Sequence, residues 1–311
     1  MGNIFSTLKH GKNIAIVLCA VGAGFLIPEL GKQLRPLVTP LVALLVYISL
    51  WDTNSDSSLI SSYWNLLIVF LILSYGIIPV IGIFLVDLFL SGGTRTGFAI
   101  MLAAPTTAGS AIVWTRLSNG EVQLSTVGSI LSLFLAPVFT PLLLSNLLSN
   151  TVSVPAMSII TDLVIILGGG ILLYSVLPTQ AVSEKNINYL TSFCIMLLIY
   201  ITVSGSNVTN IESDWLTQVF LMSLILLALG LMVVVFTKKI FRLSYSKTAS
   251  LYYISNMKNL GIAVLISVSY TEPLVLSTIV FYYVFQQFVA AIFSDIQKRR
   301  TNTRQKSIIR S

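Results

Sequence analysis

A lysine flanked by asparagines lies inside an apolar part of the chain, in the stretch YYISNMKNLGIAV at 252–264. Lys258 is eleven residues from Lys247, or about 16 Å along a helix, so it falls near the middle of a bilayer. A lysine at that depth costs about 2.5 to 3.5 kcal/mol on insertion scales, and such residues usually serve a function. We therefore predict that Lys258 acts in substrate binding or in ion coupling.

A second polar interruption, PTTAGS, lies in the middle of the apolar stretch 97–117. Pro105 lacks a backbone donor and breaks or kinks a helix there. Backbone groups freed by such a break must face protein or water, because lipid cannot bond them. The half-helices that end and begin at a break carry partial negative and partial positive charges. Two crossing breaks would thus form a polar pocket, with Lys258 facing it.

The candidate substrate-binding residues come from both interruptions. They are Pro105, Thr106, Thr107, Gly109, Ser110, Asn256, Lys258 and Asn259. A structural alternative remains open for several of them, because Pro105 can simply kink a helix and Ser or Thr can bond a carbonyl of its own helix. For Lys258 that alternative is weaker, since no acidic residue is predicted at its depth.

The composition predicts an integral membrane protein. Hydrophobic residues make up 55% of the 311 residues, charged residues only 9%, and the mean hydropathy is +0.91, whereas soluble domains have about 25% charged residues. The apolar runs are long and do not alternate, which favours helices over a barrel. We expect an all-α polytopic protein with ten spans, at 13–27, 36–50, 66–90, 97–117, 122–144, 157–177, 187–203, 215–237, 249–269 and 274–296.

Ten spans divide into two five-helix repeats, 1–150 and 151–296, followed by a basic tail at 297–311. An odd number of spans in each half gives the halves opposite orientations. The two interruptions then occupy the fourth span of each half. Matching interruptions in inverted repeats indicate the substrate site of a secondary transporter.

The positive charges predict the orientation. Fourteen of the eighteen Lys and Arg residues fall in loops on one side and three on the other, so both termini should be cytoplasmic, in a plasma or inner membrane. The basic clusters can meet anionic lipid head groups. Nucleic acid is not an expected partner, because no stacking aromatics accompany those clusters.

Enzymatic and metal chemistry have little support in the sequence. His10 is the only histidine, and Cys19 and Cys194 lie in separate spans without metal-ligand spacing. We expect no metal, no cofactor and no enzyme.

The stretch APTTAGSAIVWTRLSNGEVQLSTVGSILSLFLAPVFTPLLL, at 104–144, resembles the first crossover helix and the following helix of the bile acid:sodium symporter superfamily. The stretch NMKNLGIAV resembles the second crossover of that superfamily. The resemblance implies a panel domain of the first, second, sixth and seventh spans and a core domain of the other six. Substrate would bind between the two domains at the crossed helices, and transport would proceed by alternating access.

The chain departs from the superfamily at its sodium sites. Symporters of this kind hold two sodium ions with one Glu, one Asn and two Gln, and the equivalents here are Ile254, Ala111, Lys258 and Ser74. Loss of the carboxylate and gain of an ammonium disfavour sodium. The resemblance and the spacing on one helix face suggest further cavity-lining residues, and the ion-coupling candidates are Lys258, Ser125, Ser129 and Met257.

Lys258 then replaces the charge of a bound sodium, either as a fixed counter-charge for an anionic substrate or as a group that exchanges a proton during transport. Proton coupling and uniport both stay open. One alternative is arsenite efflux, although the related permeases have a Cys where this chain has Thr106. The other is a membrane receptor on the same scaffold that binds a ligand without moving it.

Overall fold

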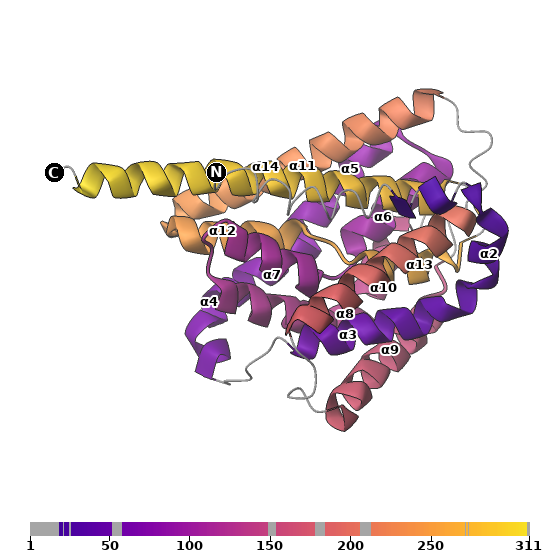
Figure 1. Cartoon of the computed structure of the whole chain (residues 1–311). Coiled ribbons are helices and arrows are strands. Elements are labelled where there is room, and N and C mark those ends of the chain that lie inside the picture. The colour runs from indigo at the N-terminus through magenta and orange to yellow at the C-terminus, as the bar shows by residue number, and fades with distance from the viewer. Residues whose placement is uncertain are drawn as a thin grey trace.

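The computed structural model describes residues 19–20, 22–24, 26–51, 58–148, 154–177, 184–205, 213–270, 272 and 274–309. The described residues confirm the all-α prediction, since they form helices (Figure 1) and one isolated β-bridge, between Thr106 and Lys258. The first predicted span, 13–27, lies largely outside the described residues, and so does the predicted boundary at residue 150.

The helices follow one another along the chain with short connections. Their order is α2 (Pro28–Gln33), η1 (Arg35–Leu37), α3 (Val38–Trp51), α4 (Ser58–Ile72), the π-turn η2 (Leu73–Ile77), α5 (Ile78–Phe89), α6 (Gly92–Ala103), α7 (Ala108–Leu117), α8 (Val122–Leu148), α9 (Ala156–Val176), α10 (Glu184–Gly205), α11 (Ser213–Phe241), α12 (Tyr245–Asn256), α13 (Leu260–Ser267) and α14 (Val275–Ile309).

Five stretches of the described chain are long and apolar enough to cross a membrane. They are Ser61–Phe89, Val122–Leu148, Ala156–Val176, Asp214–Phe241 and Val275–Ser294. Shorter apolar helices cover Arg35–Ile48 and Tyr189–Ile201. The predicted spans at 97–117 and 249–269 are each divided into two short helices, α6 with α7 and α12 with α13. Both divisions fall at the polar interruptions.

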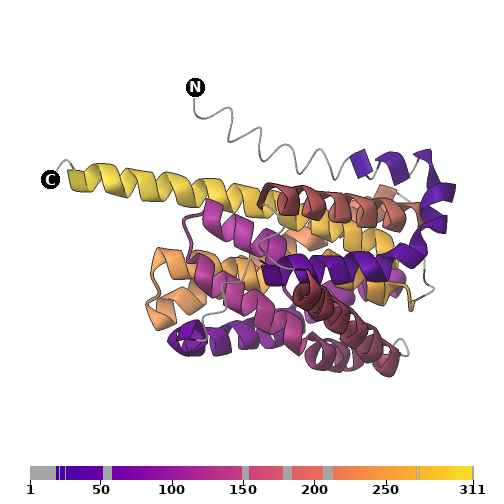
Figure 2. The ribbon, with the colours of Figure 1, turned by 60° about the horizontal axis from the view of Figure 1, so that its bottom comes forward.

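The helices pack closely along one another, and α9 also packs against α8. Helix α3 packs along α9 and α10, while α6 packs against α8 and α14, and α12 against α8 and α11. Small residues permit close approach, because a Cβ added at Gly170 of α9 would lie 2.4 Å from Val46 of α3. A Cβ at Gly97 of α6 would lie 2.7 Å from Thr278 and from Val275 of α14. The C-terminal part of α14 extends beyond the neighbouring helices in both views (Figure 1, Figure 2).

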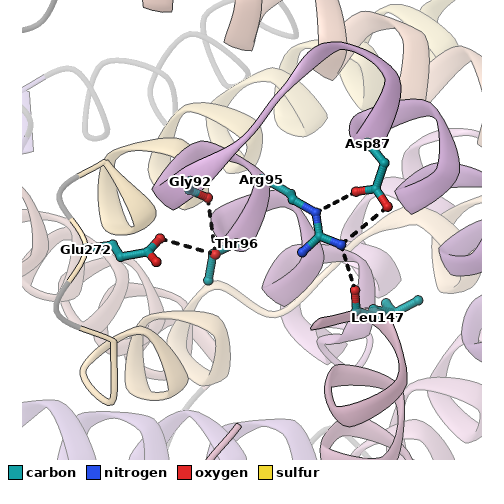
Figure 3. A network of polar contacts seen from close by, with 6 residues as sticks. All are labelled: Asp87, Gly92, Arg95, Thr96, Leu147 and Glu272. Atoms are coloured by element: carbon teal, nitrogen blue, oxygen red, sulfur yellow. Dashed lines mark hydrogen bonds and ion pairs between the residues drawn. The ribbon is translucent and has the colours of Figure 1, made fainter. Parts of the chain in front are cut away.

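An ion pair closes the turn between α5 and α6. The Arg95 guanidinium donates to the Asp87 carboxylate from Nε at 2.6 Å, and also to the Leu147 carbonyl near the end of α8 at 2.9 Å (Figure 3). A cation at a helix C-terminus is stabilised by the partial negative charge there. Thr96, one residue further along α6, donates to Gly92 O and to the Glu272 carboxylate. These bonds join α5, α6, α8 and the segment before α14.

Candidate functional site

The two polar interruptions unwind the chain at 104–107 and 257–259, and these unwound segments cross one another. Thr107 N–H donates to Met257 O at 2.9 Å, and Asn259 N–H donates to Pro105 O at 2.8 Å. The two bonds form the antiparallel bridge between Thr106 and Lys258. Each broken helix therefore satisfies part of the freed backbone of the other, as the lipid environment demands.

The remaining backbone groups of Lys258 are bonded by a side chain that the sequence analysis did not single out. Lys258 N–H donates to Gln286 Oε1 at 3.1 Å, and Gln286 Nε2 donates to Lys258 O at 3.0 Å. Gln286 lies on α14 and is buried. Its amide thus takes the place of a neighbouring strand. The signal in the sequence was the pair QQ inside an otherwise apolar span.

The Lys258 side chain is buried, with 1% of its surface exposed. Its Nζ donates to the carbonyl and the hydroxyl oxygen of Ser74, both at 3.2 Å, and lies 5.7 Å from the centre of the Tyr75 ring. Ser74 and Tyr75 belong to the π-turn η2, whose wider turn changes the register of backbone hydrogen bonds. The resemblance had aligned Ser74 with an ion-site residue, but the π-turn was not predicted.

A chain of hydrogen bonds connects the same π-turn to the other unwound segment. The Tyr75 hydroxyl lies 2.7 Å from Ser132 Oγ, which accepts from Thr106 N–H at 2.9 Å. The Thr106 hydroxyl donates to Ile254 O at the end of α12. Ser132 on α8 therefore accepts a hydrogen bond from the backbone N–H of Thr106, as Gln286 does from that of Lys258. Tyr75 was not among the predicted site residues, whereas Ser132 lies on the helix face that was predicted, with Ser125 and Ser129, to line the cavity.

Three other predicted residues lie near the break without facing an open space. The buried Asn256 amide donates to Tyr252 O and packs on Gly230 of α11. Met257 is 1% exposed, and its backbone carbonyl accepts the hydrogen bond from Thr107 N–H at the crossing. The Ser110 hydroxyl on α7 is buried and has no hydrogen-bond partner.

The predicted serines of α8 differ in their partners. The Ser125 hydroxyl lies 2.7 Å from the Thr115 hydroxyl of α7. The Ser129 hydroxyl is buried without a partner. Of the three serines on this face, Ser132 is the one that bonds an unwound segment.

A small pocket, about 30 Å³ in volume, lies beside the crossing, and we call it the crossover pocket. It is lined by Thr107 and Asn259, the last residues of the two unwound segments, and by Gly109 and Gly261, which follow them. Leu45 and Ile48 of α3, Thr191 and Leu198 of α10, Leu260 and Tyr283 complete the lining. The pocket therefore lies where α3 and α10 meet the unwound segments. Lys258 was expected to face this pocket, but its side chain instead points to Ser74.

Two helices begin at the crossover pocket. Thr107 and Asn259 are the N-cap residues of α7 and α13, and Gly109 and Gly261 occupy the same position two residues later in each helix. Amides in the first turn of a helix lack partners in that helix, and its dipole gives this end partial positive charge. Asn259 caps one amide, that of Ile262. The pocket thus combines neutral polar side chains with two positive helix ends.

Broken helices that cross inside an apolar helical protein, next to a pocket, are typical of secondary transporters. The sequence profile of the SBF-like CPA transporter family, which is related to the bile acid:sodium symporters, matches residues 14–299. The chain belongs to this family, as the resemblance had predicted. It is an integral membrane protein of a transporter class, which favours transport over catalysis. A search of curated proteins finds no match.

Proposed function

We propose that this protein is a secondary transporter that carries a small organic anion by alternating access, with the anion bound in the crossover pocket. The observation that carries the proposal is the convergence of the α7 and α13 N-termini on that pocket. Each N-terminus is equivalent to roughly half a positive charge. Together they suit a single carboxylate.

The lining supports a substrate with one anionic group and a small apolar body. The pocket is lined by neutral residues, and its polar side chains are Thr107, Thr191, Asn259 and Tyr283. Leu45, Ile48 and Leu198 form an apolar side. A charged head and an aliphatic tail would each contact a matching surface, but the pocket must widen to admit them, because about 30 Å³ is far below the roughly 300 Å³ of a small ligand site.

Thr106 argues for an organic anion over arsenite. It occupies the position where the arsenite permeases have a Cys, but it is buried and donates to Ile254 O rather than lining the pocket. Cys194 on α10 is buried and does not line the pocket either. No thiol is therefore placed to bind a soft ligand among the residues that line the pocket.

The packing of the helices supports a panel domain that moves against the core domain during transport. Helix α3 packs against α9 and α10, α10 packs against α2, and the crossover pocket lies where α3 and α10 meet the unwound segments. We assign these helices to one body and the remaining helices to another, with the inverted repeats 1–150 and 151–296 and both termini cytoplasmic. Rocking of one body against the other would expose the pocket to each side in turn.

Thermal unfolding of the purified protein tests the proposed binding chemistry. Short carboxylates of two to six carbons are compared with their uncharged amides, in sodium chloride and in choline chloride at equal ionic strength. We expect carboxylates to raise the melting temperature, amides to leave it unchanged, and sodium to make no difference, because ligands stabilise by mass action. Equal stabilisation by the amides, or a strict need for sodium, would contradict the proposal.

A further inference from the structure

We propose that the turn between α11 and α12 binds the phosphate group of an anionic lipid at the membrane boundary. The site is formed by Lys238 and Lys239 in the last turn of α11, Arg242 in the turn itself, and Lys247 in the first turn of α12. We call it the lipid-phosphate site. It is distinct from the crossover pocket, because none of these four residues lines that pocket.

The four basic residues lie where α11 leaves the apolar part of a membrane. The candidate span Asp214–Phe241 ends one residue before Arg242 and includes the two lysines in its last turn. Phe241 and Tyr245 are 55% and 45% exposed, and aromatic side chains gather at the level of the lipid head groups. Lysine side chains near a helix end extend toward the same level. The turn is therefore at the depth of the lipid phosphates.

No acidic side chain neutralises the lipid-phosphate site within the part of the chain that the structure describes. The ion pairs recorded there lie elsewhere, one within α2 and one between α5 and α6. The side chains of Lys239 and Arg242 are exposed. A cluster of cations at this depth attracts anionic lipids, because their negative charge is concentrated at the membrane surface. An anionic lipid thus supplies the charge that the cluster lacks.

A cation–π contact joins the two helices that form the site. Lys238 Nζ lies 3.4 Å from the centre of the Tyr245 ring, so the last turn of α11 contacts the first turn of α12. The basic residues of both turns therefore lie together. Helix α12 leads from this turn to the unwound segment at 257–259, and a lipid bound here contacts the start of a helix whose end forms the crossing.

Arg242 occupies a backbone position that favours glycine. Its φ is 50°, and Leu243 N–H donates to Lys238 O at 3.1 Å, which is the hydrogen bond that closes a helix through a left-handed residue. Glycine adopts this conformation without the steric cost that a side chain adds. The backbone does not account for an arginine here, whereas a bound phosphate does, because a guanidinium group can donate two hydrogen bonds to phosphate oxygens.

Lys247 lies at the end of α12 where a cation is unfavourable. The Ser244 hydroxyl accepts from Lys247 N–H at 3.3 Å and caps the helix, so this lysine is in the first turn, which has no acidic residue. The helix dipole gives that end partial positive charge. An anion bound beside the turn would offset this repulsion. Arg242 and Lys247 thus share a place that local helix rules disfavour and that a phosphate group stabilises.

Native mass spectrometry of the detergent-solubilised protein tests the inference by counting bound lipids. Phosphatidylglycerol is compared with the neutral phosphatidylcholine of the same acyl chains, and inorganic phosphate is added as a competitor. We expect a saturable phosphatidylglycerol site in the wild type, no such site for phosphatidylcholine, and no displacement of the lipid by inorganic phosphate. Equal binding of the two lipids, or displacement by the free ion at equal concentration, would overturn the inference.

Two double variants remove the same charge from different places. Lys239→Gln with Arg242→Gln should weaken phosphatidylglycerol binding about twenty-five-fold, at about five-fold for each charge. Lys298→Gln with Arg299→Gln removes two charges from the basic tail in α14 and is the matched control, which should keep the wild-type affinity. Equal weakening by the two double variants would mean that the lipid responds to diffuse surface charge, which contradicts a defined site.

Arg242→Gly separates lipid binding from folding. It relieves the left-handed backbone, so the melting temperature without lipid should be unchanged or higher, while the affinity for phosphatidylglycerol should fall about five-fold. A lower melting temperature with unchanged lipid affinity would show a structural role for Arg242 and would overturn the inference. The carboxylate experiment needs no added lipid, so the two proposals can fail separately.

Discussion

The side chain of Gln286 pairs with the backbone of Lys258 as one peptide group pairs with another. Its oxygen accepts the Lys258 N–H and its nitrogen donates to the Lys258 carbonyl, at 3.1 and 3.0 Å. Both residues are buried, so water cannot replace these bonds. The unwound segment thus depends on one side chain of α14 for the backbone groups that the crossing leaves unpaired.

Gln286→Leu should therefore destabilise the protein more than an ordinary polar substitution. It leaves a buried donor and a buried acceptor unpaired, at about 1 to 3 kcal/mol each. Gln287→Leu is the matched control, because it loses one bond, from Trp114 Nε1. Thermal unfolding in detergent measures both variants. Equal melting temperatures for the two would show that the pairing contributes little.

The sequence predicted where the two helices break. It did not predict which groups form hydrogen bonds with the backbone that the breaks expose. Pro105 and Lys258 stand out because each violates a rule for a helix in lipid. The cross-bonding of Thr107 with Met257 and of Asn259 with Pro105 requires the two segments to meet, and spacing alone does not fix that contact.

The direction of the Lys258 side chain could not be predicted either. The side chain of a lysine beside a polar break can reach several groups of acceptors. Which group it bonds here depends on the π-turn that contains Ser74. A π-turn has no clear sequence signature, so the separation of Lys258 from the crossover pocket emerged only from the structure.

Ser129 and Ser132 provide a second test, because they lie on the same face of α8 but differ in their bonds. Ser129→Ala should leave stability unchanged or raise it slightly, since its buried hydroxyl has no partner. Ser132→Ala should lower stability by about 1 to 3 kcal/mol, because Thr106 N–H loses its acceptor. The melting temperatures decide between these outcomes. A larger loss in Ser129→Ala would indicate that Ser129 has a ligand in the working protein.

Two glycines in apolar helices should respond oppositely to alanine. A Cβ at Gly230 would lie 1.6 Å from Asn256 Oδ1, so Gly230→Ala must displace the residue that ends α12. A Cβ at Gly168 meets nothing within 4 Å, and Gly168→Ala should be neutral or stabilising by up to about 1 kcal/mol. Thermal unfolding compares the two. A melting temperature for Gly230→Ala equal to that of Gly168→Ala would contradict the contact between α11 and α12.

Arg95 should stabilise the turn between α5 and α6. Its side chain is 11% exposed and bonds both Asp87 and the Leu147 carbonyl. Arg95→Leu should lower stability by about 1 to 2 kcal/mol, since part of the ion pair with the more exposed Asp87 is screened by water. In a double-mutant cycle with Asp87→Ala, a coupling energy near zero would mean that only the carbonyl contact matters.

The flux of a short carboxylate into proteoliposomes is the direct test of the proposal that the protein transports an anion bound in the crossover pocket. The carboxylate that most raises the melting temperature is supplied in radiolabelled form, with and without sodium, to the wild type and to Gly109→Leu. Gly109 lines the crossover pocket opposite Thr191, so a bulky side chain there should fill the pocket while Gly168→Leu on the open side of α9 should not. We predict saturable, sodium-independent uptake by the wild type and Gly168→Leu, and uptake by Gly109→Leu no higher than in empty liposomes. Binding without uptake by the wild type, or undiminished uptake by Gly109→Leu, would contradict it.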